Sequence, residues 1–316
     1  MNDLMFSIGA VFPLLVMMAA GYAARCLRWI DSSTVRKMNH CVFHFFLPCL
    51  LCLNIMEAER RTPIDSMPLL FALVVCVGVF LLTMILVPRF CKQRNACGVL
   101  IQGIARSNYA VFGIPLVTSM YPGADTSIAV MLVLVVVPVF NVMATVVLMI
   151  YGEEKGEKGN VLRIVKGVLL NPLIIGTVLG FVLWKLQVVL PAILAEPFQK
   201  IGAMTTPLAL FLLGASLHFG QAKQNVGRLA VGVLGRLVLV PCLGLGLAIA
   251  MGMRNVVLAS MIAVFASPTA VSSYPMAQQM GGDDNLAAGQ VAFSTVFSTI
   301  TTFLWILVLR STGFLG

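Results

Sequence analysis

Charged residues are scarce in this sequence of 316 residues, of which Asp, Glu, Lys and Arg together make up only 10%. Soluble domains carry about 25% charged residues. Apolar residues reach 59% instead, and the mean hydropathy is +0.99. They come in long blocks separated by short polar stretches, which is the pattern of helices that cross a bilayer. The composition excludes an ordinary soluble protein and predicts an all-α polytopic membrane protein.

Acidic residues are missing from the middle of the apolar blocks, because all 12 lie in loops or near block ends. This absence argues against an intramembrane aspartyl protease and against a central carboxylate cage for Na⁺. Cys49 and Cys52 form a CxxC pair inside an apolar block, without a second pair or a nearby ligand set, so we interpret them as packing residues. We expect no enzymatic activity, no cofactor and no metal site.

A basic start typical of a signal peptide is also missing, so the first apolar block is interpreted as a retained span. The length leaves room for about ten spans of ~20 residues and for no soluble domain. The predicted spans are 5–25, 38–56, 67–90, 96–121, 126–151, 162–184, 200–219, 226–252, 254–280 and 285–310.

The basic residues are divided unequally between the two sides of such a bundle. The loops after the odd-numbered spans hold thirteen Lys and Arg residues, against six on the other side. By the positive-inside rule the first side is cytoplasmic, which places both termini outside the cytoplasm in a cell membrane. The net charge of +9 is therefore interpreted as a topology signal, with no nucleic-acid partner. Residues 153–161 are predicted to be a cytoplasmic linker.

The two halves of the chain, 1–152 and 162–316, form an internal repeat. An offset of 159 residues superposes Pro13 on Pro172, Gly21 on Gly180 and Pro48 on Pro207. An offset of 160 superposes four residues of 107–115 on their counterparts in 267–275: Ser107 on Ser267, Ala110 on Ala270, Val111 on Val271 and Pro115 on Pro275. Since each half holds an odd number of spans, the repeat is predicted to be inverted, as in many secondary transporters.

The fourth and ninth spans are predicted to be broken near mid-depth. SNYAVFGIP contains Gly113 and Pro115, and ASPTAVSSYP contains Pro268 and Pro275. Interrupted backbone in a membrane survives only where protein or a water-filled cavity satisfies it, and each resumed helix offers N–H groups to an anion. We therefore predict a substrate site at the two breaks; the alternative is that the prolines only kink two buried helices.

Three segments, SNYAVFGIPLV (107–117), PLALFLLGASL (207–217) and SPTAVSSYPMAQQMGGDDNLAA (267–288), resemble the auxin efflux carrier family of secondary transporters, in particular its bacterial branch. The resemblance covers essentially the whole chain. It implies a scaffold domain of spans 1, 2, 6 and 7 and a transport domain of spans 3–5 and 8–10, in which helices 4 and 9 cross. It also implies small organic anions as substrates, movement of the elevator type and a homodimer formed by the scaffold.

The family's crossover asparagine corresponds to Asn108, and its counterpart proline corresponds to Pro268. The second repeat has no asparagine there, so its share of polar contacts is open. The resemblance and the residue types together give a predicted substrate-binding set of Ser107, Asn108, Tyr109, Pro268, Thr269 and Ser273.

Two arginines and one asparagine complete the set of site candidates. Arg106 precedes the first break and Arg236 lies deep in the eighth span, where a cation is a functional candidate by default. The alternative for each is snorkelling to the cytoplasm or pairing with backbone carbonyls at the crossover. Asn141 either lines the cavity or bonds a neighbouring helix.

Three histidines and a GxxxG motif are secondary features. His40 and His44 lie on one helix face, where a proton relay is the less favoured interpretation, and His218 is assigned to an interface. Gly176 and Gly180 are expected to allow close helix packing within the chain.

The sequence thus predicts a secondary active transporter of small carboxylates that works by alternating access. The predicted driving force is the proton gradient or the membrane potential, and coupling to Na⁺ is disfavoured. The alternatives are a sodium-coupled symporter of the bile acid type, an anion channel, and a membrane enzyme or receptor.

Overall fold

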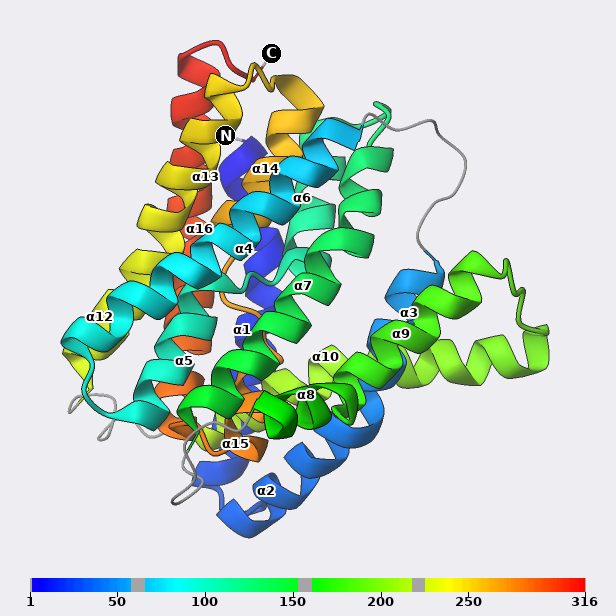
Figure 1. Cartoon of the computed structure of the whole chain (residues 1–316), viewed down its shortest axis with the longest axis vertical. Helices are drawn as coiled ribbons and strands as arrows, with labels where there is room; N and C mark the ends of the chain where they lie inside the picture. The colour runs from blue at the N-terminus through cyan, green and yellow to red at the C-terminus, as the bar shows by residue number, and fades with distance from the viewer. Residues whose placement is uncertain (1, 58–65, 153–160, 218–224, 316) are drawn as a thin grey trace.

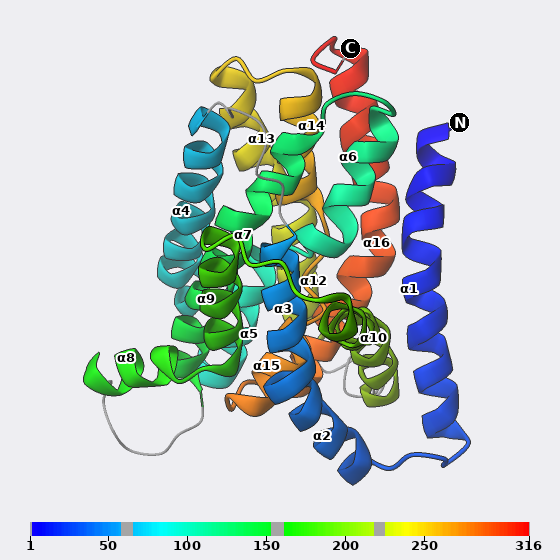
Figure 2. The same cartoon turned by 90° about the vertical axis from the view of Figure 1, so that its right-hand side faces the viewer.

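The computed structural model describes residues 2–57, 66–152, 161–217 and 225–315 as an all-helical molecule with a single isolated β-bridge. Figures 1 and 2 show that α1 begins and α16 ends at the same end of the molecule, whereas α2 and α15 lie toward the opposite end. The elements are α1 (Asn2–Cys26), α2 (Ser32–Cys41), η1 (Val42–Phe46), α3 (Leu47–Met56), α4 (Ser66–Phe90), α5 (Arg94–Ala105), η2 (Tyr109–Gly113), α6 (Ile114–Met120), α7 (Ser127–Tyr151), α8 (Val161–Leu169), α9 (Pro172–Lys185), α10 (Ala192–Ser216), α12 (Val226–Leu234), η3 (Gly235–Leu239), α13 (Val240–Ala250), α14 (Asn255–Ala266), α15 (Ser273–Gln279) and α16 (Asp284–Ser311).

Five helical stretches of the described chain are long and apolar enough to cross a membrane: Ser32–Met56, Ser66–Phe90, Ser127–Tyr151, Val226–Ala250 and Asp284–Ser311. Their outward faces carry large apolar side chains, such as Leu70, Val74 and Ile85 on α4. An apolar exterior on helices that satisfy their own backbone is what a bilayer requires.

Glycines allow two helix pairs to approach closely. A Cβ on Gly21 of α1 would lie 1.8 Å from the carbonyl oxygen of Phe211 in α10, and one on Gly180 of α9 would lie 2.7 Å from that of Cys52 in α3. Gly176 packs in the same way on Pro48. The hydrophobic effect does not drive helix association in lipid. Small residues instead let the helix backbones approach closely, so that van der Waals packing holds the helices together. The prediction that the GxxxG motif packs within the chain is confirmed.

Three short π-helical segments share a cause. Each of η1, η2 and η3 comes directly before an α-helix with proline in its first turn, namely Pro48, Pro115 and Pro241. Proline lacks an N–H donor and clashes with the carbonyl four residues earlier, and a wider turn at that place relieves the clash.

Two predicted span boundaries are wrong. The span predicted at 162–184 is divided into α8 and α9, because the Asn171 side chain caps α9 by accepting a hydrogen bond from the Leu173 N–H, 2.9 Å, directly before Pro172. The span predicted to start at residue 200 begins at Ala192, with Pro197 accommodated inside α10. The predicted linker 153–161 lies outside the described residues except for its last residue, and His218 also lies outside them.

Candidate substrate-binding site

Two helices stop in the interior of the molecule, and their interruptions lie side by side. α5 ends at Ala105 and the chain is helical again from Tyr109, whereas α14 ends at Ala266 and helix resumes at Ser273. Ser107 and Thr269 form an antiparallel β-bridge between the two gaps. The Asn108 N–H donates to the carbonyl of Pro268 at 2.8 Å. The interruptions precede Gly113, Pro115 and Pro275, which lie within the helical segments that follow.

Arg236 fills the space where the two helices end. Its guanidinium is fully buried and donates to the carbonyls of Ile104 and Ala105 at the end of α5. It also donates to the carbonyls of Val264, Phe265 and Ser267 at and just beyond the end of α14. These five acceptors match the five N–H donors of an arginine side chain.

The charge of Arg236 is therefore balanced by helix ends rather than by an acid. The last turn of each helix has unpaired carbonyls and a partial negative charge, and a buried cation stabilises both. Arg236 does not line the cavity described below. The structure thus favours the second of the two interpretations of this residue, pairing with backbone carbonyls.

A buried cavity of about 60 Å³ lies where the interruptions meet α3, α7 and α10. A water molecule needs roughly 10–15 Å³ of such space, so the cavity has room for only a few. Its polar lining includes Arg106, Ser107, Asn108 and Ser272 from the interruptions, and Asn54, Thr205 and Thr206 from α3 and α10; no acidic residue lines it within the described chain.

Arg106 is the cation of this cavity. Its Nη2 donates to Oδ1 of Asn141 at 2.7 Å and to Oγ of Ser272 at 2.8 Å, and its Nη1 contacts the sulfur of Met276. These partners are neutral, so the guanidinium keeps its full positive charge next to the cavity. Asn141 is absent from the cavity lining, and its side chain bonds Arg106, so the structure favours the second interpretation of this asparagine, a bond to a neighbouring segment.

Two hydrogen-bond donors on the cavity lining have no partner in the described chain. They are Nδ2 of Asn108 and Oγ of Ser107, both buried. An unpaired buried polar group costs ~1–3 kcal/mol, so such groups call for a ligand or water. Donors and a guanidinium, without a competing carboxylate, form a site that favours an anion.

The other predicted site residues support the interruptions. The Tyr109 hydroxyl donates to the carbonyl of Ala129, although the residue also borders the cavity. Thr269 is absent from the lining: its Oγ1 donates to the carbonyl of Gly103 at 2.8 Å, and its N–H donates to Oγ of Ser294 at 3.1 Å. Ser273 lies outside the lining too, and its carbonyl accepts a hydrogen bond from Gln102 at 3.1 Å.

Sequence reasoning missed the polar side chains contributed by α3 and α10. Asn54 interrupts an apolar run, and Thr205 and Thr206 precede Pro207, so a polar residue at mid-span was the available signal. Ser272 was also left out of the predicted set. His44 does not line the cavity, and its ring stacks on that of His40 with a centroid distance of 4.0 Å.

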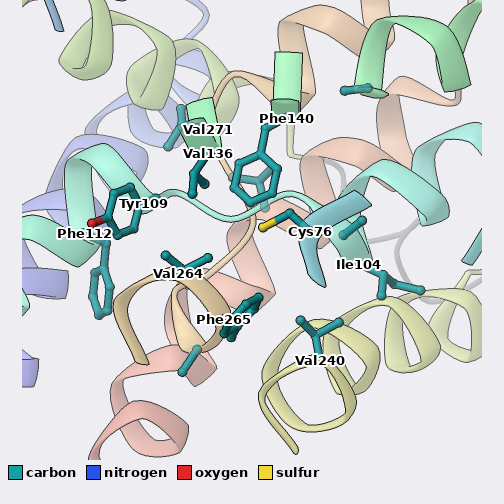
Figure 3. Close-up of a cluster of buried hydrophobic side chains, with 14 of the residues drawn as sticks. Cys76, Ile104, Tyr109, Phe112, Val136, Phe140, Val240, Val264, Phe265 and Val271 are labelled. Carbon is teal, nitrogen blue, oxygen red and sulfur yellow. The ribbon is translucent and has the colours of Figure 1, made fainter. Parts of the chain in front are cut away.

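Apolar side chains surround the interruptions on the remaining sides. Figure 3 shows Phe140 and Val136 of α7 on one side of the extended segment, with Phe265 and Val264 of α14 on the other. All four are buried. This packing excludes water, so that electrostatic attraction to Arg106 is weakly screened.

A polar network lies at a second cavity of about 230 Å³, which is lined by residues of α2, α10 and α15. The Asn39 side chain donates to Oε1 of Gln278 at 3.0 Å, Gln278 donates to the Tyr274 hydroxyl at 3.2 Å, and the Tyr274 and Ser216 hydroxyls share a hydrogen bond. We call these four residues the polar latch. Ser216, Tyr274 and Gln278 line the second cavity, and none of the four residues lines the first.

An all-helical protein with apolar outer faces and a buried, acid-free polar cavity at two interrupted helices has the build of a membrane transporter. Residues 6–306 match the family model described as membrane transport protein, the family of the auxin efflux carriers, and the chain belongs to that family. It is 24% identical over 311 residues to a protein named uncharacterized transporter YfdV of Escherichia coli K12, covering 97% of this chain and 99% of the relative. The proteins of that name from Escherichia coli O157:H7 and Shigella flexneri match to the same extent.

Proposed function

We propose that this membrane transporter is a secondary active carrier of small organic anions that binds a carboxylate at the two helix interruptions. The observation that carries the proposal is the acid-free cavity at which Arg106 meets the unpartnered donors of Ser107 and Asn108. A carboxylate would accept hydrogen bonds from these groups and from the first N–H groups of the helix that begins at Tyr109.

We further propose ten spans in two inverted repeats. Support comes from the glycine contacts, because Gly21 packs on Phe211 and Gly180 packs on Cys52. The same offset of 159 residues relates the two glycines and the two residues that they touch. A contact that recurs under the repeat offset is expected of two halves related by a pseudo-two-fold axis. Asn108 and Pro268, which contact each other directly, are related by an offset of 160.

Helix packing supports a division into a scaffold and a transport domain. α1 packs on α10, and α3 packs on both α9 and α10, which is the expected scaffold group. α7 packs on α4 and α5, α14 on α13, and α15 on α16, which is the expected transport group. The cavity lies between the groups, so relative movement would open it alternately to each side.

The sidedness follows the basic residues. The end of α1, the helix α2 and the starts of α5 and α12 lie toward the end of the molecule that holds α15 (Figure 1), and they carry Arg25, Arg36, Arg94 and Arg228. We assign this end to the cytoplasm. Both termini are then outside. The homodimer remains a proposal from the family.

Uptake into proteoliposomes tests the transport class. Labelled small dicarboxylates and monocarboxylates should enter wild-type vesicles, show counterflow with unlabelled substrate, and be unaffected when choline replaces sodium. A large current without counterflow would indicate an anion channel, and loss of uptake in choline would indicate a sodium symporter. No saturable uptake of any organic anion, by a protein that remains folded, would contradict the proposal.

A further inference from the structure

An apolar groove runs along the outer surface between α12 with η3 and α16. Its volume is about 590 Å³, and its walls come from Leu229, Ala230, Val233 and Leu237 on one side and from Phe293 and Phe297 on the other. Thr301 is the only lining residue with a polar side chain among the described residues. Such a surface offers hardly any hydrogen bonds to a polar substrate. Figure 1 shows α12 at the edge of the molecule, away from α3 and α9.

The shape of the groove arises from side-chain size. Ala230 presents only a methyl group between larger neighbours. Near Leu237, Trp305 of α16 bonds to η3: its Nε1 donates to the carbonyl of Leu237 at 3.1 Å. Phe293 and Phe297 stack with ring centroids 6.5 Å apart, which fixes one wall. The groove is therefore held open by contacts made within the chain.

The length of the groove matches one leaflet of a bilayer. From Val226 to Val238 the helix rises about 18 Å at 1.5 Å per residue. The hydrocarbon of one leaflet is about 15 Å deep, half of a core of ~30 Å. A single acyl chain that lies parallel to α12 would extend from the membrane surface to the end of the groove.

The end of the groove at the membrane surface is basic. Arg228 lies in the first turn of α12, and its Nη1 donates to Oε1 of Gln93 at 2.8 Å and to Oδ1 of Asn225 at 3.2 Å. Gln93 is flanked in the chain by two further basic residues, Lys92 and Arg94, and Arg94 donates to the carbonyl of Ile150 at 2.6 Å. Asp283, at the start of α16, uses its carboxylate to cap that helix by accepting from the Leu286 N–H at 2.9 Å.

We propose that this groove is a binding site for an anionic glycerophospholipid, with one acyl chain between α12 and α16 and the headgroup phosphate at Arg228. The apolar walls, which are about as long as one leaflet is deep, bind the acyl chain. The basic residues at the end of the groove favour a headgroup with a negative charge. The site is separate from the substrate cavity and needs no transport activity. Its occupant would stabilise the packing of α12 on α16.

Native mass spectrometry of the purified chain with added phosphatidylglycerol or phosphatidylcholine tests this site. We expect the wild type to retain one phosphatidylglycerol more tightly than phosphatidylcholine. Ala230→Trp, which fills the groove, should abolish retention, and so should Thr301→Trp if the first variant does not fold. Arg228→Gln should weaken phosphatidylglycerol binding about fivefold, the effect of ~1 kcal/mol per cation near the surface.

Matched controls are Leu247→Trp on the exposed face of α13 and Lys185→Gln in the last turn of α9, both outside the groove, which should retain the lipid. Equal retention of the two lipids by the wild type would overturn the proposal. So would unchanged phosphatidylglycerol binding in the groove-filling variants. Two further results would assign the groove to another occupant and overturn the proposal. One is that inorganic phosphate alone stabilises the protein as much as phosphatidylglycerol does. The other is that Ala230→Trp abolishes a dimer without changing the amount of bound lipid.

Discussion

At the scale of single residues, Arg106 and Arg236 show how one residue type serves two purposes in the same membrane. Arg236 donates to five carbonyls at two helix ends, whereas Arg106 has neutral side-chain partners and borders the cavity. The sequence identified both as deep cations. It did not distinguish them, because the acceptors of Arg236 come from α5 and from the chain around the end of α14, far away in the sequence.

Arg236→Gln should lower the stability of the protein much more than the loss of one surface charge. The shorter neutral side chain leaves several buried carbonyls unpaired, each at a cost of ~1–3 kcal/mol, so we expect a loss of at least about 3 kcal/mol. Thermal unfolding in detergent measures this. Lys185→Gln is the control, since Lys185 is an exposed cation at a helix end. An unfolding temperature equal to that of the control would contradict the helix-end role.

Asn108 is the predicted site residue that both the break and the family resemblance indicate. The structure adds that its Nδ2 is buried without a partner in the described chain. Ser272, Asn54 and Thr206 were not predicted, because periodicity cannot show which side chains of separate spans meet at one cavity.

At the scale of elements, the breaks in the fourth and ninth spans were predicted near the right places, but for an incomplete reason. Gly113, Pro115 and Pro275 suggested the breaks, yet the chain is extended before them and helical around them. Proline is accommodated in the first turn of a helix, so it marks where a helix restarts. The division of α8 from α9 was missed because the Asn171 cap lies inside an apolar run.

Glycine contacts give a matched test of helix packing. Gly180→Ala should destabilise the protein, because the added methyl group would lie 2.7 Å from the Cys52 carbonyl oxygen. Gly78→Ala in α4 is the control: a Cβ there meets nothing within 4 Å, and alanine should stabilise the helix by roughly 0.5–1 kcal/mol. Chemical or thermal unfolding of both variants shows the difference. Equal effects of the two substitutions would mean that the α3 and α9 backbones are not in close contact.

The polar latch predicts a change in access to the cavity. Tyr274→Phe removes the hydroxyl that bonds Ser216 and Gln278, with a net loss of about 0.5–1.5 kcal/mol per hydrogen bond. Loss of both bonds, about 1–3 kcal/mol in total, should raise the open population by roughly fivefold to a hundredfold. A cysteine at Ala110, which lines the cavity, should then react faster with a water-soluble thiol reagent, in a background with Cys26, Cys41 and Cys242 replaced by Ser.

Tyr151→Phe is the control for that measurement, since Tyr151 lies at the end of α7 and outside the latch. Labelling at the same rate in Tyr274→Phe and in the control would show that the latch does not limit access to the cavity.

At the scale of the whole molecule, composition alone was sufficient for the class of protein. The scarcity of charge predicts a helical membrane protein, and the structure gives apolar outer faces and five long apolar helical stretches in the described chain. What composition cannot give is the pairing of helices. α1 packs on α10, and α3 packs on α9, through glycines whose partners are more than a hundred residues away.

The placement of polar side chains in the whole molecule explains how a chain of this length can be a transporter. Arg106, Ser107 and Asn108, which are buried polar residues, line the cavity at the interruptions, and α3 and α10 close it from the other side. Binding of an anion there is the central claim. It can be tested without knowing the direction of transport or the coupling ion.

The most direct measurement is the affinity of the purified protein for small carboxylates, found by a thermal-shift screen and quantified by calorimetry, in wild type, Asn108→Ala and Asn108→Asp. We expect a carboxylate that stabilises the wild type to bind about 10–100-fold more weakly to Asn108→Ala, the value of one hydrogen bond to a charged group. In Asn108→Asp the side chain keeps nearly the same shape but carries a negative charge, which repels a carboxylate, so this variant should bind still more weakly. All three proteins should unfold at similar temperatures without ligand. Unchanged affinity in both folded variants would contradict the site.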